Sequence, residues 1–273
     1  MSREKAIRDY FGALIRQWGP QDWWPAHTAF EVITGAYLTQ NTAWINVEHA
    51  LRSLRRAGAL SVDGIRRSSL PRLQQLVRPA GYFRQKAERI KLFVQYLDDR
   101  YSGSLKQMFR RPTRELREEL LSLKGIGPET ADSILLYAGG HASFVVDAYT
   151  RRVFERHGVL KGTERYEEIR ELFERALERQ AEPRWQAAGF RPAAVLPGRR
   201  RHKFRITTVH RSARLFDEYH ALLVQVAKHH CFKKAPKCDG CPLQAFLPPG
   251  GPAEVKAIRR TPPGKMKRRG TGR

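Results

Sequence analysis

LREELLSLKGIGPETADSILLYAGG, residues 116–140, is the stretch that decides the fold. Leucines at helical spacing lead up to Gly125 and Gly127, and a second apolar helical pattern follows Pro128. Glycines allow a tight turn with positive φ and leave backbone amides uncovered, and proline suits the first turn of a helix. The stretch therefore predicts a helical hairpin whose second helix begins with free amides that can hold a phosphate. An ordinary hairpin without a ligand is the alternative that a lone pair of glycines leaves open.

Helical periodicity also dominates the sequence outside the hairpin. Apolar residues recur three and four positions apart near residues 7–14, 30–37, 92–97, 169–177 and 219–226. Gly, Pro and Ser separate these segments. The single strand-like run, Phe144–Val146, is short. We therefore predict an all-α protein of about ten short helices.

Several motifs, in order along the chain, carry a family resemblance. They are AYLTQNTAW (36–44), GYFRQKAERI (81–90), LKGIGPETADSILLYA (123–138) and VVDAYTRRVFERHG (145–158). Together they resemble the helix-hairpin-helix DNA glycosylases of the endonuclease III superfamily, over residues 22–247. The resemblance implies a base-excision-repair enzyme that hydrolyses the N-glycosidic bond of a damaged base after the base has flipped out of the duplex.

The resemblance also implies a two-lobed helical organisation. One lobe, with the hairpin, would span residues 25–139. Residues 1–24 and 140–247 would form the second lobe, which carries the catalytic aspartate and a cysteine loop. The expected partner is double-stranded DNA with a damaged base, bound by a monomer in the cleft between the lobes.

Asp147 is the candidate catalytic carboxylate. From the residues alone, its place before AYTRRVFER favours a helix N-cap, because Asp accepts hydrogen bonds from the free amides of a first turn. The resemblance makes Asp147 the glycosylase carboxylate, and the two roles can coexist. A fixed anion stabilises the positive charge that develops on the deoxyribose as the base leaves.

The resemblance assigns DNA contacts to two of the motifs. In LTQNT it implies that Gln40, beside Asn41, fills the gap in the duplex, with a polar helix cap as the alternative role for Gln40. The other predicted DNA-binding residues lie in the hairpin: Lys124, Gly125, Gly127 and Thr130. Phosphate contacts of this kind position a protein without reading the base sequence.

Glu129 bears on whether the enzyme is monofunctional or bifunctional. Bifunctional members of the family carry a Lys at this position, two residues after the second hairpin glycine, and form a Schiff base with the sugar. A carboxylate cannot form an imine, so we predict a monofunctional enzyme with weak or absent AP-lyase activity. Glu129 is our second candidate catalytic residue, with helix capping as the alternative.

Adenine glycosylases carry a general-acid Glu where this chain has Gly35, while Glu31 lies a turn further away, which disfavours removal of mismatched adenine.

Alkylated purines are the lesion class that the motifs favour. Such bases already carry positive charge, so they leave without acid assistance and can be recognised by aromatic stacking with a cation–π contribution. Trp23, Trp24 and Trp44 are the candidate base-pocket residues, and a core position is the alternative for at least one of them. DWWP and LTQNTAW resemble the 3-methyladenine glycosylase branch most. Another lesion, an oxidised pyrimidine or a mismatch, is the alternative substrate.

The cysteines form an incomplete motif. Cys231, Cys238 and Cys241 match the family's iron–sulfur loop, but Leu247 stands at the fourth ligand position. Because a 4Fe-4S cluster normally takes four thiolates, we predict first a loop without metal and no cofactor required for catalysis. A cluster with a substitute ligand comes second. Third is a zinc site completed by His229 or His230.

The basic residues are unevenly distributed. The chain of 273 residues has a net charge of +24, of which residues 184–214 carry +9 and residues 254–273 carry +7, leaving +8 elsewhere. We interpret residues 184–210 as a basic insert and residues 248–273 as a disordered basic tail. Both would add salt-dependent affinity for DNA. The start of the chain has no apolar signal core and no run reaches the length of a membrane span, so we expect a cytoplasmic, nucleoid-associated protein of bacterial type.

Two classes without this chemistry are the rivals. One is a helix-hairpin-helix DNA-binding protein that has lost catalysis, which the incomplete cysteine motif favours slightly. The other is an RNA-binding protein driven by its arginine segments. Retention of Asp147 together with Gln40 argues against the first, and the second would not require the glycosylase motifs at all.

Overall fold

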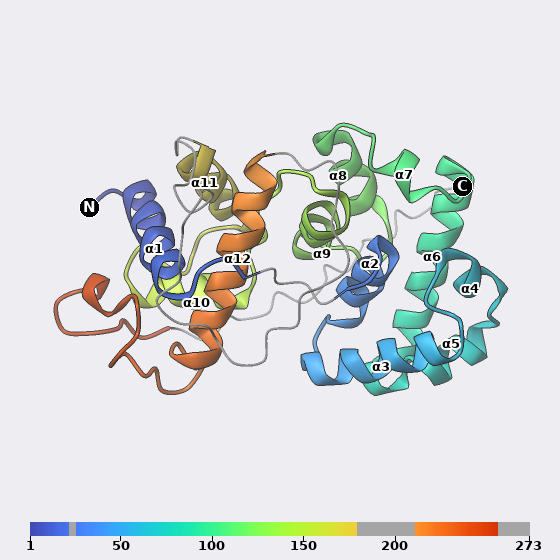
Figure 1. Ribbon diagram of the computed structural model, residues 1–273, viewed down its shortest axis with the longest axis horizontal. Coiled ribbons are helices and arrows are strands. Elements are labelled where there is room, and N and C mark those ends of the chain that lie inside the picture. The colour runs from blue at the N-terminus through green and yellow to red at the C-terminus, as the bar shows by residue number, and fades with distance from the viewer. Residues whose placement is uncertain (22–25, 179–210, 256–273) are drawn as a thin grey trace, which may run out of the picture.

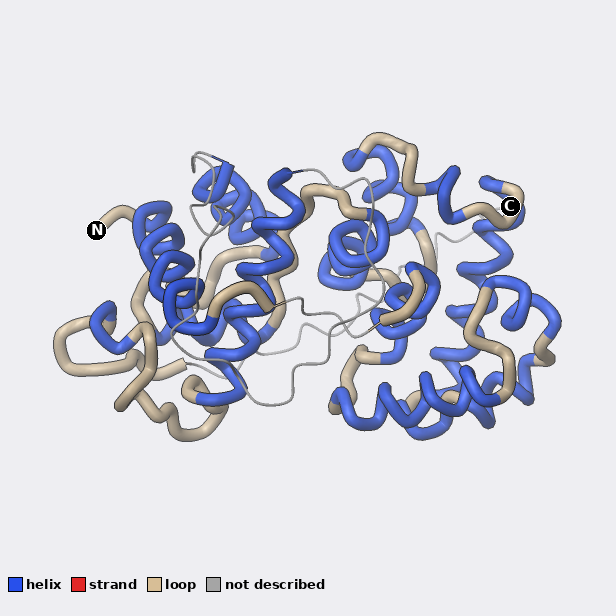
Figure 2. The backbone as a smooth tube through the Cα atoms, viewed as in Figure 1, coloured by secondary structure: helices blue, strands red, loops and turns tan. Residues whose placement is uncertain are grey.

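The computed structural model describes residues 1–21, 26–178 and 211–255. In these residues all regular structure is helical, and Figure 2 shows loops between the helices. The predicted all-α class is therefore confirmed. None of the described helices is long and apolar enough to cross a membrane.

The strand-like run at residues 144–146 forms no strand in the described part of the chain. Its backbone amides bind side chains instead. Phe144 N donates to Glu174 Oε1 at 2.9 Å, and Val146 N donates to the Tyr166 hydroxyl at 3.3 Å. These bonds satisfy buried backbone groups without a sheet, and they fix the segment that leads into Asp147.

The helices pack in two groups, which occupy the two sides of Figure 1. The group that we call the hairpin half contains α2 (Ala29–Leu38), α3 (Trp44–Arg56), α4 (Val62–Arg67), α5 (Leu70–Leu76), η1 (Arg78–Ala80), α6 (Phe83–Tyr101), α7 (Leu105–Met108), α8 (Thr113–Ser122), α9 (Pro128–Ser133) and η2 (Ile134–Gly139). The terminal half contains α1 (Arg3–Trp18), α10 (Ala148–Arg156), α11 (Tyr166–Glu178), α12 (Arg211–His229) and η4 (Gln244–Phe246). In the terminal half α1 packs against α11 and α12, so both ends of the chain build this half.

Each long helix buries the face that its periodicity indicated. Tyr10 and Phe11 of α1 and Tyr219 of α12 are at most 1% exposed, and the rings of Phe11 and Tyr219 meet edge to face at 5.1 Å. Leu92 of α6 departs from the pattern, because it is 39% exposed although its spacing placed it with the core residues.

The hairpin consists of α8, a turn at residues 123–127, and α9, which continues directly into η2. η2 is a π-helix, a rarer and wider turn than the α-helix that the periodicity predicted. It packs against α2, α9 and α12, so it lies where the two halves meet. Gly140, with φ +70°, ends it.

An ion-pair network also joins the two halves. Arg117 of α8 binds Asp132 of α9 with two hydrogen bonds, of 2.7 and 3.0 Å, and reaches Glu167 of α11 at 2.8 Å. Asp132 is fully buried and also accepts a bond from the Ser143 hydroxyl. The network therefore ties the hairpin to α11 and to the segment that precedes Asp147.

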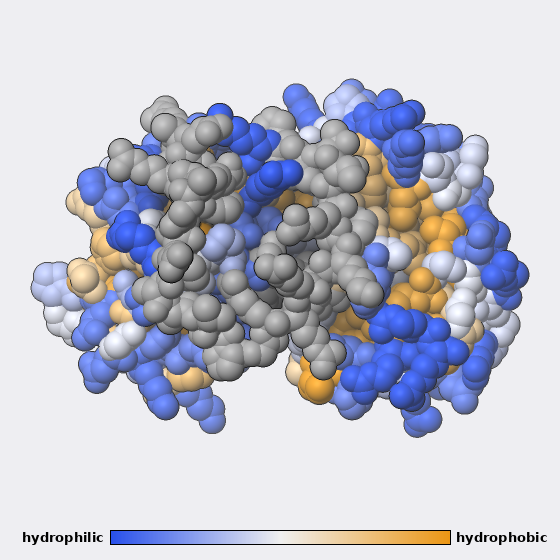
Figure 3. All heavy atoms as spheres, in the orientation of Figure 1, coloured by the Kyte–Doolittle hydropathy of each residue, from blue (hydrophilic) through white to orange (hydrophobic). Residues whose placement is uncertain are grey.

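Hydrophobic residues gather on the hairpin half in the face shown in Figure 3, where hydrophilic residues border them. A groove of about 370 Å³ lies in this half, between α4, α5 and α6. Leu70 and Leu92 line it beside Asp98 and Asp99. It shares no residue with the candidate site.

Candidate active site

Asp147 is the N-cap of α10, as predicted. Its Oδ1 atom accepts hydrogen bonds from Tyr149 N at 3.0 Å and Thr150 N at 2.8 Å. These bonds satisfy two of the free amides at the helix start. The side chain keeps 15% of its surface exposed, so the carboxylate is held rigidly and still reaches solvent.

His220 of α12 faces the other carboxylate oxygen. Its Nε2 atom lies 3.4 Å from Asp147 Oδ2. Burial alone would raise the pKa of Asp147, but the nearby His220 and the hydrogen bonds at the helix start hold that pKa below its usual value. Asp147 is therefore an anion at neutral pH.

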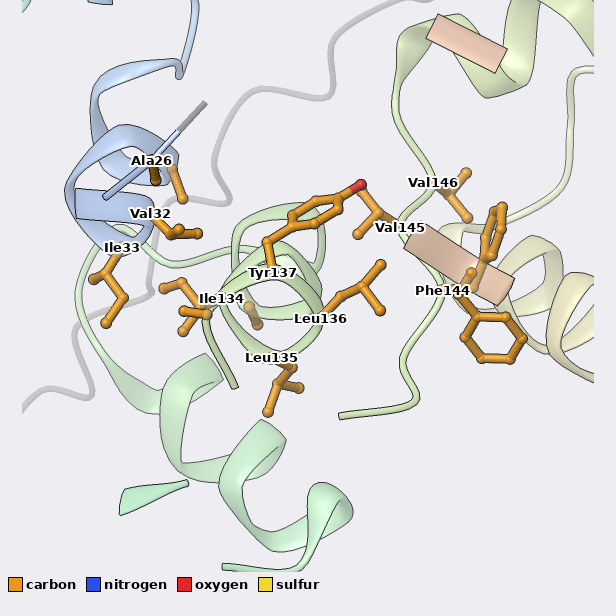
Figure 4. Close-up of a cluster of buried hydrophobic side chains, with 14 of the residues drawn as sticks. Ala26, Val32, Ile33, Ile134, Leu135, Leu136, Tyr137, Phe144, Val145 and Val146 are labelled. Carbon is orange, nitrogen blue, oxygen red and sulfur yellow. The ribbon is translucent and has the colours of Figure 1, made fainter. Parts of the chain in front are cut away.

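Tyr137 of η2 supports His220 from behind. Its hydroxyl is hydrogen-bonded to His220 Nδ1 at 2.5 Å. In Figure 4 the Tyr137 ring extends from η2 toward Val145, while Ile134 points the other way, toward α2. Burial raises the pKa of Tyr137 well above its ordinary value, so the phenol stays protonated.

Glu129 is the second residue of α9 and lies close enough to Asp147 for the two carboxyl groups to interact electrostatically. Its side chain keeps contact with solvent. Desolvation by the surrounding protein, followed by the negative charge of Asp147, raises the pKa of Glu129 to about 7, although His220 and Arg151 act in the opposite direction. The site thus holds two carboxyl groups whose pKa values are shifted in opposite directions, which is an arrangement suited to acid–base chemistry near neutral pH.

Gln40 lies beyond the end of α2 and contacts the hairpin. Its Nε2 atom donates to Gly125 O at 2.9 Å and to Thr130 Oγ1 at 3.0 Å. Arg89 of α6 donates to Gln40 Oε1 at 3.0 Å. The structure therefore brings together Gln40, Gly125 and Thr130, which the sequence analysis placed in one function from two distant motifs.

The two hairpin glycines differ in conformation. Gly125 has φ +87°, and a Cβ there would lie 2.2 Å from Arg89 Nε. Gly127 has an extended backbone with φ −100°, so the expectation of positive φ is wrong for this glycine. A Cβ on Gly127 would meet nothing within 4 Å. No side chain caps α9 at Gly127, so the start of that helix keeps its amides uncovered, as predicted.

The remaining predicted residues are more dispersed. Lys124 is exposed and pairs with Glu88 at 3.3 Å. Asn41 is exposed with φ +55°, in the left-handed region. Trp44 opens α3, half-buried, and its Nε1 donates to Glu48 Oε1 at 2.9 Å. Trp23 and Trp24 lie outside the described residues, as do the basic insert at 184–210 and most of the basic tail.

The cysteine loop offers three thiols, whereas an iron–sulfur cluster normally takes four. Cys231 is buried and accepts a 3.2 Å hydrogen bond from Arg156, whose guanidinium also binds two carbonyls of the loop. Cys238, Cys241 and Leu247 line a cavity of only about 20 Å³ beside it, room for about one water molecule. Within the described part of the chain, His, Cys, Asp and Glu side chains form no cluster of three that could hold a metal ion. Three thiols around so small a space do not provide the four ligands that a cluster normally takes.

Glu31 is occupied by a structural role. It is only 3% exposed, accepts a hydrogen bond from His27 N at 3.1 Å and pairs with Arg55. Gly35, at the place of the adenine glycosylases' general acid, is buried within α2.

Four residues near the site escaped the sequence analysis. Tyr137 and His220 looked like members of apolar helix faces, and the one available signal was a histidine among buried aliphatic residues in YHALL. Arg89 and Lys86 stand in the quoted motif GYFRQKAERI. Lys86 is buried and binds the carbonyls of Leu38 and Ala80 at 2.8 and 2.7 Å, which fixes the end of α2 just before Gln40.

Known proteins resemble this chain in sequence or in fold. A putative DNA repair glycosylase of Methanocaldococcus jannaschii is 40% identical over 242 residues, which cover 88% of this chain and 94% of that protein. A Helicobacter pylori 3-methyladenine DNA glycosylase bound to 1,N6-ethenoadenine superposes with a TM-score of 0.64 and 26% identity, covering 84% of this chain and 98% of the other. Endonuclease III in a non-covalent DNA complex superposes with a TM-score of 0.65 over 90% of this chain and 96% of the other, at 19% identity, which shows the shared fold.

The family match covers all the described site residues except His220. The HhH-GPD superfamily base excision DNA repair protein family matches residues 34–179, which contain Gln40, the hairpin, Glu129 and Asp147. The family resemblance of the four motifs is thereby confirmed. The chain belongs to the HhH-GPD superfamily of base excision DNA repair proteins.

Proposed function

We propose that the chain is a monofunctional DNA glycosylase that hydrolyses the N-glycosidic bond of alkylated purines in double-stranded DNA. The observation that carries the proposal is the Asp147 carboxylate, which is held by the amides of Tyr149 and Thr150 at the start of α10 and still reaches solvent. Asp147 would face the deoxyribose of the flipped nucleotide. Its fixed negative charge would stabilise the cationic sugar as the bond to the base breaks.

Glu129 supports hydrolysis rather than covalent catalysis. A carboxylate at this position forms no Schiff base, so the enzyme would leave the abasic strand intact. In its ionised form Glu129 can accept a proton from the attacking water. Neither carboxyl group needs a cofactor for these roles, and we include a cofactor-free reaction in the proposal.

The choice of alkylated purines rests on chemistry and on one relative. A base that is already cationic needs no acid to leave, and Gly35 offers none at the adenine-specific position. Trp44 is half-buried at the start of α3, shortly after Gln40, where a stacking ring would serve a cationic base. The structural relative from Helicobacter pylori is named a 3-methyladenine glycosylase.

DNA would be held by the hairpin and the Gln40 loop. We propose that the uncovered amides at Gly127, together with Lys124, bind a backbone phosphate. Gln40 and Asn41 would fill the space left by the flipped nucleotide. The enzyme would act as a monomer on chromosomal DNA in the cytoplasm.

A base-release assay tests the function. Purified protein with EDTA is incubated with methylated DNA and with duplexes that carry uracil, thymine glycol or adenine opposite 8-oxoguanine. We expect release of methylated purines, strand breaks only after alkali, and no product trapped by borohydride. The rate should rise as pH increases through about 7, because Glu129 loses its proton there, and Glu129→Gln should flatten this rise.

Each departure from that result has a defined meaning. If a different damaged base is released, alkylated purines are not the substrate class. A borohydride-trapped complex would contradict monofunctional hydrolysis. Binding without release of any base would support a non-catalytic DNA-binding protein instead.

The hairpin glycines provide a matched test of DNA binding. Gly127→Ala should leave the free energy of unfolding nearly unchanged, because the added methyl meets open space, but it should weaken DNA binding by covering the helix start. Gly125→Ala should lower the free energy of unfolding by about 1–3 kcal/mol, because its backbone is left-handed. Urea unfolding and fluorescence anisotropy with a duplex measure the two effects. Equal DNA affinity of wild type and Gly127→Ala would refute the phosphate contact.

A further inference from the structure

We propose that Tyr137 and His220 form a buried relay that positions the Asp147 carboxylate, with His220 as a positioning residue for base excision. The inference rests on the proposed function, since it takes Asp147 as the group that faces the sugar. Its basis is the placement of three side chains from η2, α12 and the start of α10 in one line of polar contacts.

The geometry fixes both oxygens of the carboxylate. Oδ1 is held by the amides of Tyr149 and Thr150, and Oδ2 lies 3.4 Å from His220 Nε2. The side chain of His220 is 6% exposed, whereas that of Asp147 is 15% exposed. A substrate can therefore reach the aspartate but not the histidine, so His220 acts on the reaction through Asp147.

The hydrogen bond from Tyr137 sets which ring nitrogen of His220 carries the proton. Tyr137 stays protonated and can donate its hydroxyl proton to Nδ1. The other ring nitrogen, Nε2, then carries the N–H and presents it to Asp147. The opposite tautomer would aim a nitrogen lone pair at a carboxylate, which is repulsive. A protonated His220 presents the same N–H, so either charge state orients Asp147 in the same way.

The surroundings explain why such a relay is needed. Glu129 from α9 places a second carboxyl group near Asp147, and Asp217 on α12 adds negative charge near Tyr137. Arg151 of α10 is the nearby cation that acts on Glu129. Without His220, burial and a neighbouring carboxylate would both favour protonation of Asp147. His220 thus maintains the negative charge on which transition-state stabilisation depends.

Three substitutions separate positioning from packing. His220→Asn places an amide near Nδ1 and keeps the Tyr137 contact but removes the contact with Asp147. His220→Gln reaches the position of Nε2 and restores a donor for Asp147. We expect kcat to fall about 10-fold or more in His220→Asn with KM unchanged, and to recover largely in His220→Gln. Tyr137→Phe keeps the ring and should lower kcat by less than His220→Asn does. If His220→Asn does not fold, the kcat of Tyr137→Phe tests the relay instead.

The pH profile gives a readout that packing alone does not move. His220 acts to lower the pKa values of both Asp147 and Glu129, so His220→Asn should raise both and shift the acidic limb of the kcat profile, which Glu129 sets near pH 7, to higher pH. A ¹³C NMR titration of the Asp147 carboxyl carbon should show the same upward shift without any assay of activity. His157→Asn is the matched control, because His157 is a half-buried histidine at the other end of α10 from Asp147, where its ring meets that of Tyr10 edge to face. It should leave kcat and the acidic limb unchanged.

The outcomes distinguish this inference from the proposed function. If wild type releases base, and His220→Asn matches it in kcat, acidic limb and NMR titration, the relay is wrong and the function stands. Equal losses in His220→Asn and His157→Asn would also overturn the relay. If wild type releases no base from any duplex, the proposed function fails, and an unshifted Asp147 titration in His220→Asn then refutes the relay as well.

Discussion

Replacing Asp147 with Asn is expected to lower kcat for base release by at least about 100-fold, while fold and DNA affinity persist. Asn removes the negative charge that would face the sugar but keeps an oxygen that can accept the amides of Tyr149 and Thr150. Asn and Asp are comparable N-cap residues, so α10 should remain intact. Single-turnover base release and anisotropy with a duplex that contains a stable abasic analogue measure the two properties.

Asp147→Ala is the companion variant. It removes both the charge and the cap, so it should lose activity to the same extent and should also lower the free energy of unfolding by about 1 kcal/mol. The difference between the variants isolates the structural role of the carboxylate from its chemical role. Full activity in Asp147→Asn would show that another group stabilises the transition state.

Arg117→Met is expected to destabilise the fold by about 3–5 kcal/mol, the largest stability effect that we expect from a single substitution. The change leaves Asp132 as a fully buried carboxylate without its two hydrogen bonds from the guanidinium. It also breaks the contact with Glu167 that ties α8 to α11. The shift of the urea midpoint, with the slope of the transition checked for constancy, measures the loss.

Arg114→Met is the matched control on the same helix. The Arg114–Glu118 pair is formed by side chains that are 92% and 65% exposed. Exposed pairs contribute little, so the free energy of unfolding should change by less than about 1 kcal/mol. Similar midpoints for the two variants would mean that Asp132 finds other partners when Arg117 is removed.

Local patterns made much of the site predictable. The glycine turn, the uncovered start of α9 and the cap at Asp147 depend on residues within a few positions of one another, and the structure contains all three. The family resemblance assigned DNA contacts to Gln40, Gly125 and Thr130 from motifs that are far apart in the sequence, and the structure places these three residues in contact.

The rest depends on tertiary contacts that periodicity does not encode. Tyr137 and His220 are 83 positions apart, and each has apolar neighbours in the sequence, in ILLYAG and in HALLV. Their polar contact exists only because η2 and α12 pack together. The expectation of positive φ was wrong for Gly127, because the positive φ at Gly125 is enough to turn the chain.

The π-helix at η2 makes the direction of the Tyr137 side chain depend on the number of residues in this turn. A π-turn accommodates one more residue than an α-turn, and each residue of an α-helix rotates the side chain by about 100°. Deleting one residue between Ser133 and Tyr137 would restore α-helical geometry and turn the Tyr137 phenol away from His220. In an alignment of homologues we therefore expect the extra residue and the histidine to be gained or lost together.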